Sequence, residues 1–170
     1  MDKHLKVGVA GYGVVGKRRR YYIDQHSSLR TVAVCDQNFS KSGTMDDGVR
    51  YYPNYKKLLE EPLDVLFVSL PNYLAAEVTI AGLERGLHVF CEKPPGRDLS
   101  DIKKVIEVEK KHPKFLLKYG FNHRYHDSVR EAIRLIKSGD FGDIINARGV
   151  YGKSKIIPFA GGWRAERKYS

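Results

Sequence analysis

Short apolar runs alternate with longer segments of helical composition through most of the chain. The predicted strands span residues 6–10, 31–35, 64–70, 87–91 and 115–121, and the predicted helices span residues 14–24, 55–61, 73–85 and 98–111. The run DVLFVSL at 64–70 is almost continuously apolar, which is typical of a parallel strand covered on both faces. Strands that alternate with helices indicate parallel βαβ units, so we predict a doubly wound, parallel α/β sheet.

The pattern changes after residue 122. An amphipathic helix is predicted over 127–138, a turn at Gly139 and Gly142, and a strand over 144–151. One helix and one strand cannot form an independent core. We therefore expect residues 1–122 to form one α/β domain and residues 123–170 to begin a second, incomplete α+β domain. The segment between residues 37 and 50 is rich in turn-forming residues and is predicted to be a polar loop.

Composition and cysteine content exclude several classes of protein. Of the 170 residues, 42% are hydrophobic, which is too many for a disordered chain, yet no run reaches the ~18 to 20 apolar residues of a membrane span. The two cysteines, Cys35 and Cys91, are too few for a disulfide framework or a four-ligand zinc site. We expect both to be buried and reduced, as in a cytoplasmic protein. His123 and His126 have no evident third ligand, so no metal site is predicted.

The chain is strongly basic, with a formal net charge of +10. Such a charge favours anionic partners, among them nucleic acid, phosphorylated metabolites and acidic proteins. Binding of nucleic acid is one hypothesis, but no nucleic-acid motif accompanies the charge, so we predict a small-molecule partner, no nucleic acid and no membrane. The basic run at 17–20 is interpreted as a solvated helix face, with contact to phosphate as the alternative.

A glycine-rich motif joins the first predicted strand to the first predicted helix. Gly11 permits a tight turn, Gly13 lets a pyrophosphate approach the backbone, and Gly16 allows close packing of helix on strand. The N-terminus of the helix offers free N–H groups and a positive dipole to the phosphates. The residues between the glycines are included among the predicted cofactor contacts, and these are Tyr12, Val14 and Val15.

An acidic residue at the end of the next predicted strand completes this pattern. Asp36 lies about 20 residues after the last glycine, where a carboxylate accepts hydrogen bonds from the ribose of the adenosine. Because this charge repels a 2′-phosphate, NAD is favoured over NADP, although Lys41 in the following loop could reach that phosphate. Gln37, the next residue, is also predicted to contact the cofactor.

A second candidate site follows the predicted strand at 87–91. Lys93, within Glu92-Lys93-Pro94, lies at the carboxyl end of this strand, where open α/β sheets bind their ligands. A lysine there can polarise a substrate oxygen. Spacing alone also allows an ordinary surface lysine in a turn.

Several segments taken together resemble the Gfo/Idh/MocA family of NAD(P)-dependent oxidoreductases, which act on sugars, cyclitols and nucleotide sugars. The segments that carry the resemblance are VGVAGYGVVG, Cys35-Asp36, Ser69-Leu70-Pro71-Asn72, Cys91-Glu92-Lys93-Pro94 and Gly120-Phe121-Asn122-His123-Arg124. The resemblance implies that Lys93 is catalytic and that Pro94 follows a cis peptide bond. It also implies further cofactor contacts, from Leu70, Pro71, Asn72, Glu92, Asn122, Trp163 and Arg164.

Two departures from the family pattern affect what the resemblance implies. Ala75 stands where many members have a histidine, which weakens the inference about the substrate. The family's Asp/His segment after Trp163-Arg164 does not occur before Ser170, so we expect a truncated chain, with oligomerisation possible only in a full-length form. The leading hypothesis is an NAD-dependent oxidoreductase of sugars or nucleotide sugars. The alternative is a non-catalytic NAD-binding module or sensor.

Overall fold

A computed structural model describes residues 4–150, 152 and 166 of the chain. At its centre is a seven-stranded sheet with the strand order β3-β4-β2-β1-β5-β6-β7. The strands are β1 (Leu5–Ala10), β2 (Leu29–Cys35), β3 (Gly43–Thr44), β4 (Arg50–Tyr52), β5 (Val65–Val68), β6 (His88–Cys91) and β7 (Leu117–Tyr119). All neighbouring strands are parallel except the β3–β4 pair. The predicted doubly wound α/β fold is therefore confirmed.

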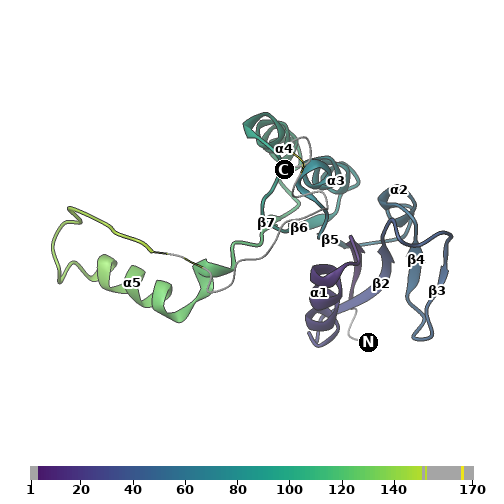
Figure 1. Cartoon of the computed structure of the whole chain (residues 1–170), viewed down its shortest axis with the longest axis horizontal. Helices are drawn as coiled ribbons and strands as arrows, with labels where there is room; N and C mark the ends of the chain where they lie inside the picture. The colour runs from purple at the N-terminus through teal and green to yellow at the C-terminus, as the bar shows by residue number, and fades with distance from the viewer. Residues whose placement is uncertain (1–3, 151, 153–165, 167–170) are drawn as a thin grey trace.

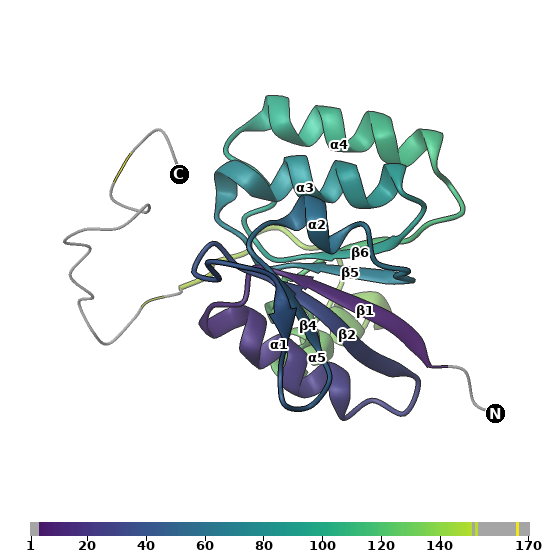
Figure 2. The same ribbon diagram turned by 90° about the vertical axis from the view of Figure 1, so that its right-hand side faces the viewer.

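Among the described residues, four helices cover the two faces of this sheet, and they are α1 (Val14–Asp24), α2 (Tyr55–Leu58), α3 (Asn72–Glu84) and α4 (Leu99–Lys111). After β7 the chain continues into a 3₁₀ turn, η1 (Asn122–Tyr125), and a further helix, α5 (Asp127–Ser138). Figure 2 shows α1 against one face and α2, α3 and α4 against the other. Local residues mark where these helices begin and end. Asp98 caps the start of α4 by accepting a hydrogen bond from the Asp101 N–H, and Gly86, with φ of +75°, follows the end of α3.

The core consists of two apolar clusters, one on each side of the sheet. Val7 and Val9 of β1 and Val34 of β2 pack on Ile23 of α1. The intervening positions of the strands face the opposite cluster, which also contains the buried side chains of α3. This alternation follows from the two-residue period of a strand. It explains why the central strands are apolar at nearly every position.

The order of the strands reverses at β1. The chain passes from β1 to β2 on one side and later returns to β5 on the other side. In open α/β sheets this reversal creates a crevice outside the carboxyl ends of the strands, where ligands bind. The strands therefore place any ligand above the end of β1.

Two predictions about secondary structure are wrong. The segment at 37–50, predicted to be a polar loop, contains β3 and the start of β4 in a short antiparallel hairpin. The strand predicted over 144–151 is absent from the described part of this range, residues 144–150. That segment is exposed, and none of the strands described in residues 4–150 pairs with it to receive its backbone hydrogen bonds.

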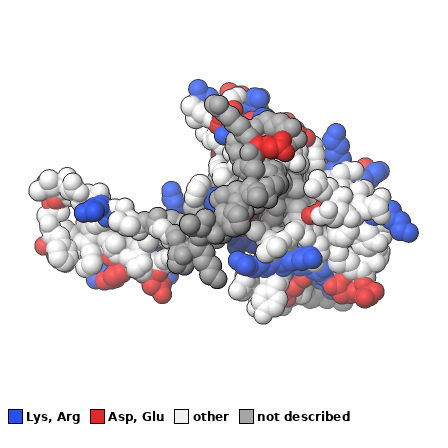
Figure 3. All heavy atoms as spheres, in the orientation of Figure 1, with Lys and Arg blue, Asp and Glu red and all other residues white. Residues whose placement is uncertain are grey.

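The last described helix stands apart from the α/β body. Figures 1 and 3 show α5 projecting away from the sheet and its covering helices. None of its residues is buried, and its main contact among the described elements is with η1. The bounds of α5 agree with the prediction, and it ends at Gly139 with φ of +76°. The domain boundary at residue 122 stays a prediction.

Candidate cofactor site at the carboxyl edge of the sheet

The loops that follow the parallel strands meet at one edge of the sheet. Hydrogen bonds join these ends directly: the N–H of Gly11 donates to Cys35 O at 2.9 Å, and the N–H of Ser69 donates to Ala10 O at 2.7 Å. The N–H of Gly120 similarly donates to Cys91 O at 2.9 Å. The sheet thus brings together segments that are up to about a hundred residues apart in sequence.

The glycine loop after β1 is tightly packed at two of its three glycines. Gly11 has φ of +89°, and a Cβ there would lie 2.5 Å from Ser69 O. A Cβ on Gly16 would overlap the carbonyl group of Gly11, so the absence of a side chain lets α1 sit against the loop. These two glycines are therefore required by the fold itself.

Gly13 has the opposite environment. It is exposed, it immediately precedes α1, and a Cβ built on it meets no atom within 4 Å. No side chain caps α1, and the first N–H groups of a helix have no acceptor within the helix. Backbone donors with a positive helix dipole and no side chain in the way form a cradle for a phosphate anion. Val14 and Val15, on the first turn, are 77% and 41% exposed.

The carboxylate of Asp36, at the end of β2, is fixed beside this loop. One of its oxygens accepts from the N–H of Tyr12 at 2.8 Å, and the other accepts from the N–H and side-chain amide of Asn38 at 3.0 and 2.7 Å. Gln37 lies exposed between them in sequence. The loop and the acidic residue predicted from their spacing are thus joined by a hydrogen bond, and the position of the carboxylate is fixed by its partners on both oxygens.

The ring of Tyr12 is held in turn by α1. The guanidinium of Arg20 donates to the Tyr12 hydroxyl at 2.8 Å and also pairs with Asp24 and Asp47. Since Asp47 lies in the β3–β4 hairpin, Arg20 connects that hairpin to α1 and to the glycine loop. Arg20 is therefore a structural residue, and the interpretation of the basic run as a solvated face is wrong for it.

The end of β5 forms the wall on the other side of the glycine loop. Leu70 lies close enough that its Cδ2 would be 3.1 Å from a Cβ on Gly11. Pro71 is the residue before α3, and both it and Asn72 are half-buried. Ala75, where many family members carry a histidine, is buried in the core on the first turn of α3.

The end of β6 carries the second candidate site. Lys93 is exposed and is joined to Pro94 by a cis peptide bond, which confirms that expectation. Glu92, directly before it, is paired with Arg19 of α1, and Arg19 Nη2 also donates to Asn122 Oδ1 at 3.3 Å. Arg19 was not among the residues predicted from sequence. Its contacts join α1 to β6 and to η1, and no local spacing indicates such contacts.

The remaining predicted features are placed as follows. Trp163 and Arg164 lie outside the described residues. Both cysteines are buried and free, as predicted, and burial raises the pKa of Cys35 to about 12 and that of Cys91 to about 11. Within the described part of the chain, no group of three or more His, Cys, Asp or Glu residues could hold a metal ion. No helix in that part is both long and apolar enough to cross a membrane.

Comparison with known proteins shows which protein family the chain matches. Residues 5–121 match the Gfo/Idh/MocA oxidoreductase family, described by its NAD-binding Rossmann fold. Inositol 2-dehydrogenase of Salmonella typhimurium is 29% identical over 160 residues, covering 91% of this chain and 48% of that protein. D-glucoside 3-dehydrogenase of Escherichia coli is 31% identical over 146 residues, covering 82% of this chain and 41% of that protein.

A solved structure similar to this chain is, like the relatives found by sequence, a dehydrogenase. Scyllo-inositol dehydrogenase of Lactobacillus casei, determined with bound NAD(H) and scyllo-inositol, superposes with a TM-score of 0.73 at 25% identity, over 83% of this chain and 43% of that one. The chain spans about half the length of the curated relatives it matches.

Proposed function

This chain belongs to the Gfo/Idh/MocA oxidoreductase family, and from that premise we propose that it binds NAD(H) across the carboxyl edge of its sheet. One observation carries the proposal. Gly13, at the uncapped start of α1, has open space where its Cβ would be, while its neighbour Tyr12 is hydrogen-bonded to the fixed carboxylate of Asp36. A phosphate cradle and a ribose acceptor are thus held side by side in the order that a dinucleotide needs.

The order of the strands assigns the two halves of the dinucleotide. Asp36 follows β2, so the adenosine lies above that side of β1. The pyrophosphate then lies over Gly13, and the nicotinamide lies above β5 and β6, on the opposite side of the switch point. In this arrangement Leu70, Pro71 and Asn72 line the middle of the crevice, and Glu92, Lys93 and Asn122 lie at its nicotinamide end.

The proposed activity is hydride transfer between the nicotinamide and one carbon of a cyclitol, sugar or nucleotide sugar. That carbon bears a hydroxyl group in the reduced substrate and a carbonyl oxygen in the oxidised one, and oxidation also releases the hydroxyl proton. The nicotinamide supplies the hydride chemistry when it is bound. The ammonium group of Lys93, exposed at the end of β6, donates a hydrogen bond to the substrate oxygen and stabilises the negative charge that develops on it. The names of the relatives, inositol and glucoside dehydrogenases, support a polyhydroxylated substrate. These relatives are about twice as long as this chain, so the proposed turnover rests on the similarity to them. The proposed binding of the cofactor rests on this chain's own residues.

The preference for NAD over NADP is assigned to Asp36. Its carboxylate lies where the 2′-position of the ribose is expected, and a 2′-phosphate would meet this negative charge. Titration of NADH and NADPH into the purified chain tests this. We expect NADH to bind at least about tenfold more tightly, a difference of about 1.4 kcal/mol.

Two variants separate the charge of Asp36 from its shape. Asp36→Asn keeps the size of the side chain and removes the charge, so the preference for NADH should shrink about tenfold. Asp46→Asn, which neutralises an exposed carboxylate of the following loop, is the matched control and should leave the preference unchanged. Equal affinity of the wild-type chain for NADH and NADPH would contradict the assignment, and no binding of either would contradict the proposed function.

A further inference from the structure

Arg19 is the only member of the basic run 17–20 that reaches the β6 end of the site, as judged from the described residues. Its Nε donates to Glu92 Oε1 at 2.6 Å, and its Nη2 approaches the same oxygen and also donates to Asn122. The Arg19 and Glu92 side chains are only 24% and 13% exposed. A charge-assisted contact of this kind, shielded from water, orients both partners more strongly than an exposed surface pair does.

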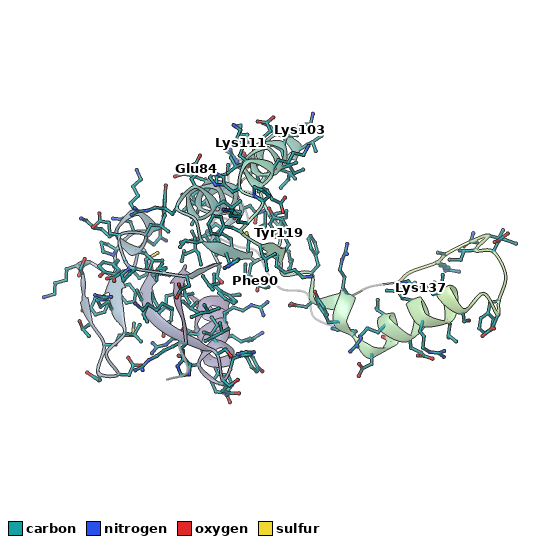
Figure 4. All side chains as sticks on the ribbon, turned by 180° about the vertical axis from the view of Figure 1, so that it is seen from behind. Glu84, Phe90, Lys103, Lys111, Tyr119 and Lys137 are labelled. Carbon is teal, nitrogen blue, oxygen red and sulfur yellow. The ribbon has the colours of Figure 1, made fainter. Side chains whose placement is uncertain are left out.

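An aromatic side chain packs against one face of the Arg19 guanidinium. The Arg19 guanidinium carbon lies 4.8 Å from the centre of the Phe90 ring, and Phe90 stacks on Phe67 of β5 at 4.9 Å. Phe90 lies close to the point where the chain leaves the sheet toward α5 (Figure 4). The flat guanidinium is therefore fixed by a ring on one side and by two oxygen acceptors at its edge.

The backbone on the other side of Glu92 is shaped to receive this carboxylate. A Cβ on Gly120 would lie 2.8 Å from Glu92 Oε2 and 3.1 Å from its carboxyl carbon. Gly120 does not have a positive φ, so the backbone conformation does not require glycine there. The missing side chain leaves room for the Glu92 carboxylate in the position that Arg19 holds.

We propose that Arg19 is a positioning residue for the nicotinamide half of the site, acting through Glu92. Arg19 fixes the Glu92 carboxylate and neutralises its charge, and through it holds the start of the Glu92-Lys93-Pro94 turn. The adenosine half depends on a different set of contacts, around Tyr12, Asp36 and Arg20. Loss of Arg19 should therefore affect recognition of the nicotinamide and leave the adenosine half intact. This inference rests on the proposed binding of NAD(H).

Two ligands distinguish the two halves of the site. NADH occupies both halves, whereas ADP-ribose has the adenosine, both phosphates and the second ribose but no nicotinamide. For Arg19→Ala we expect the affinity for NADH to fall about tenfold, as for loss of one buried charge-assisted contact, and the affinity for ADP-ribose to stay within about twofold. The change in nicotinamide fluorescence on binding should also diminish, which a purely structural role of Arg19 would not cause.

Three further variants sharpen the test. Arg18→Ala removes the same charge from an exposed neighbour on the same helix and should change neither affinity. Arg19→Lys keeps the charge without the planar fork and should restore only part of the NADH affinity. Gly120→Ala displaces Glu92 from the opposite side, so it should reproduce the selective loss. Because Arg19→Lys and Gly120→Ala perturb the contact more mildly, they keep the test decisive if Arg19→Ala does not fold.

The outcomes separate this inference from the proposed function. Equal losses for both ligands in Arg19→Ala, or no loss for either, would overturn the role of Arg19 while leaving the dinucleotide site in place. A wild-type chain that binds ADP-ribose and NADH equally well would overturn it too, because the nicotinamide would then not be recognised. A wild-type chain that binds neither ligand would overturn the proposed function itself, and this inference with it.

Discussion

Residues of the same type have different roles in this chain, and the surroundings of each residue determine its role. Gly16 is enclosed by the Gly11 carbonyl, whereas Gly13, three residues earlier, faces open space. The motif predicts close packing at Gly16 and an open approach at Gly13, and the surroundings of the two residues agree with that prediction. The same holds for the basic run: Arg18 is exposed, while Arg19 and Arg20 bind carboxylates on distant segments. Contacts between distant elements cannot be inferred from helix composition.

The two cysteines give a residue-scale prediction. Burial raises the pKa of Cys35 to about 12 and that of Cys91 to about 11, so at pH 8 on the order of one Cys91 thiol in a thousand is ionised, and fewer of Cys35. Because the thiolate is the reactive form, we expect neither to react with a disulfide reagent such as DTNB in the folded chain. Both should react at once in denaturant. Rapid labelling of either thiol without denaturant would contradict the buried positions.

At the scale of elements, the sequence predicts the helices and strands that are long enough to show their pattern of apolar and polar residues. The bounds of α5 agree with the prediction because its amphipathic period is regular and Gly139 follows its last residue. The bounds of α1 agree because its composition is helical and Gly13 directly precedes it. The hairpin of β3 and β4 was missed because strands of two and three residues have no detectable alternation. The strand predicted over 144–151 is absent from its described part, residues 144–150, because a strand also needs a partner, and the alternation of side chains does not supply one.

The isolation of α5 leads to a prediction about its contribution to stability. Since no residue of α5 is buried, replacing an apolar side chain of this helix, as in Ile136→Ala, removes almost no buried apolar surface. We expect the free energy of unfolding of this variant to change by less than about 0.5 kcal/mol, and its affinity for NADH to change by less than about twofold. Chemical denaturation and titration of the variant measure both quantities. A loss of several kcal/mol would show that α5 packs on the α/β body in solution.

At the scale of the whole molecule, fold and charge act together. The doubly wound sheet brings the ends of β1, β2, β5 and β6 to one edge, and the fold class could be predicted because strands and helices alternate so regularly. A net charge of +10 attracts anions from a distance, without determining which anion binds. In the proposed function, specificity depends on the few residues that the sheet brings together, above all Gly13 and Asp36.

Titration of NADH into the wild-type chain and into Gly13→Val, by calorimetry, tests this account most directly. The new side chain enters space that is empty in the structure, so the fold should lose no more than about 1 kcal/mol at this helix cap, while NADH affinity should fall at least about tenfold. Gly149→Val, at an equally open glycine that is not part of the loop after β1, is the matched control and should bind like the wild type. Unchanged affinity in a folded Gly13→Val chain would contradict the account.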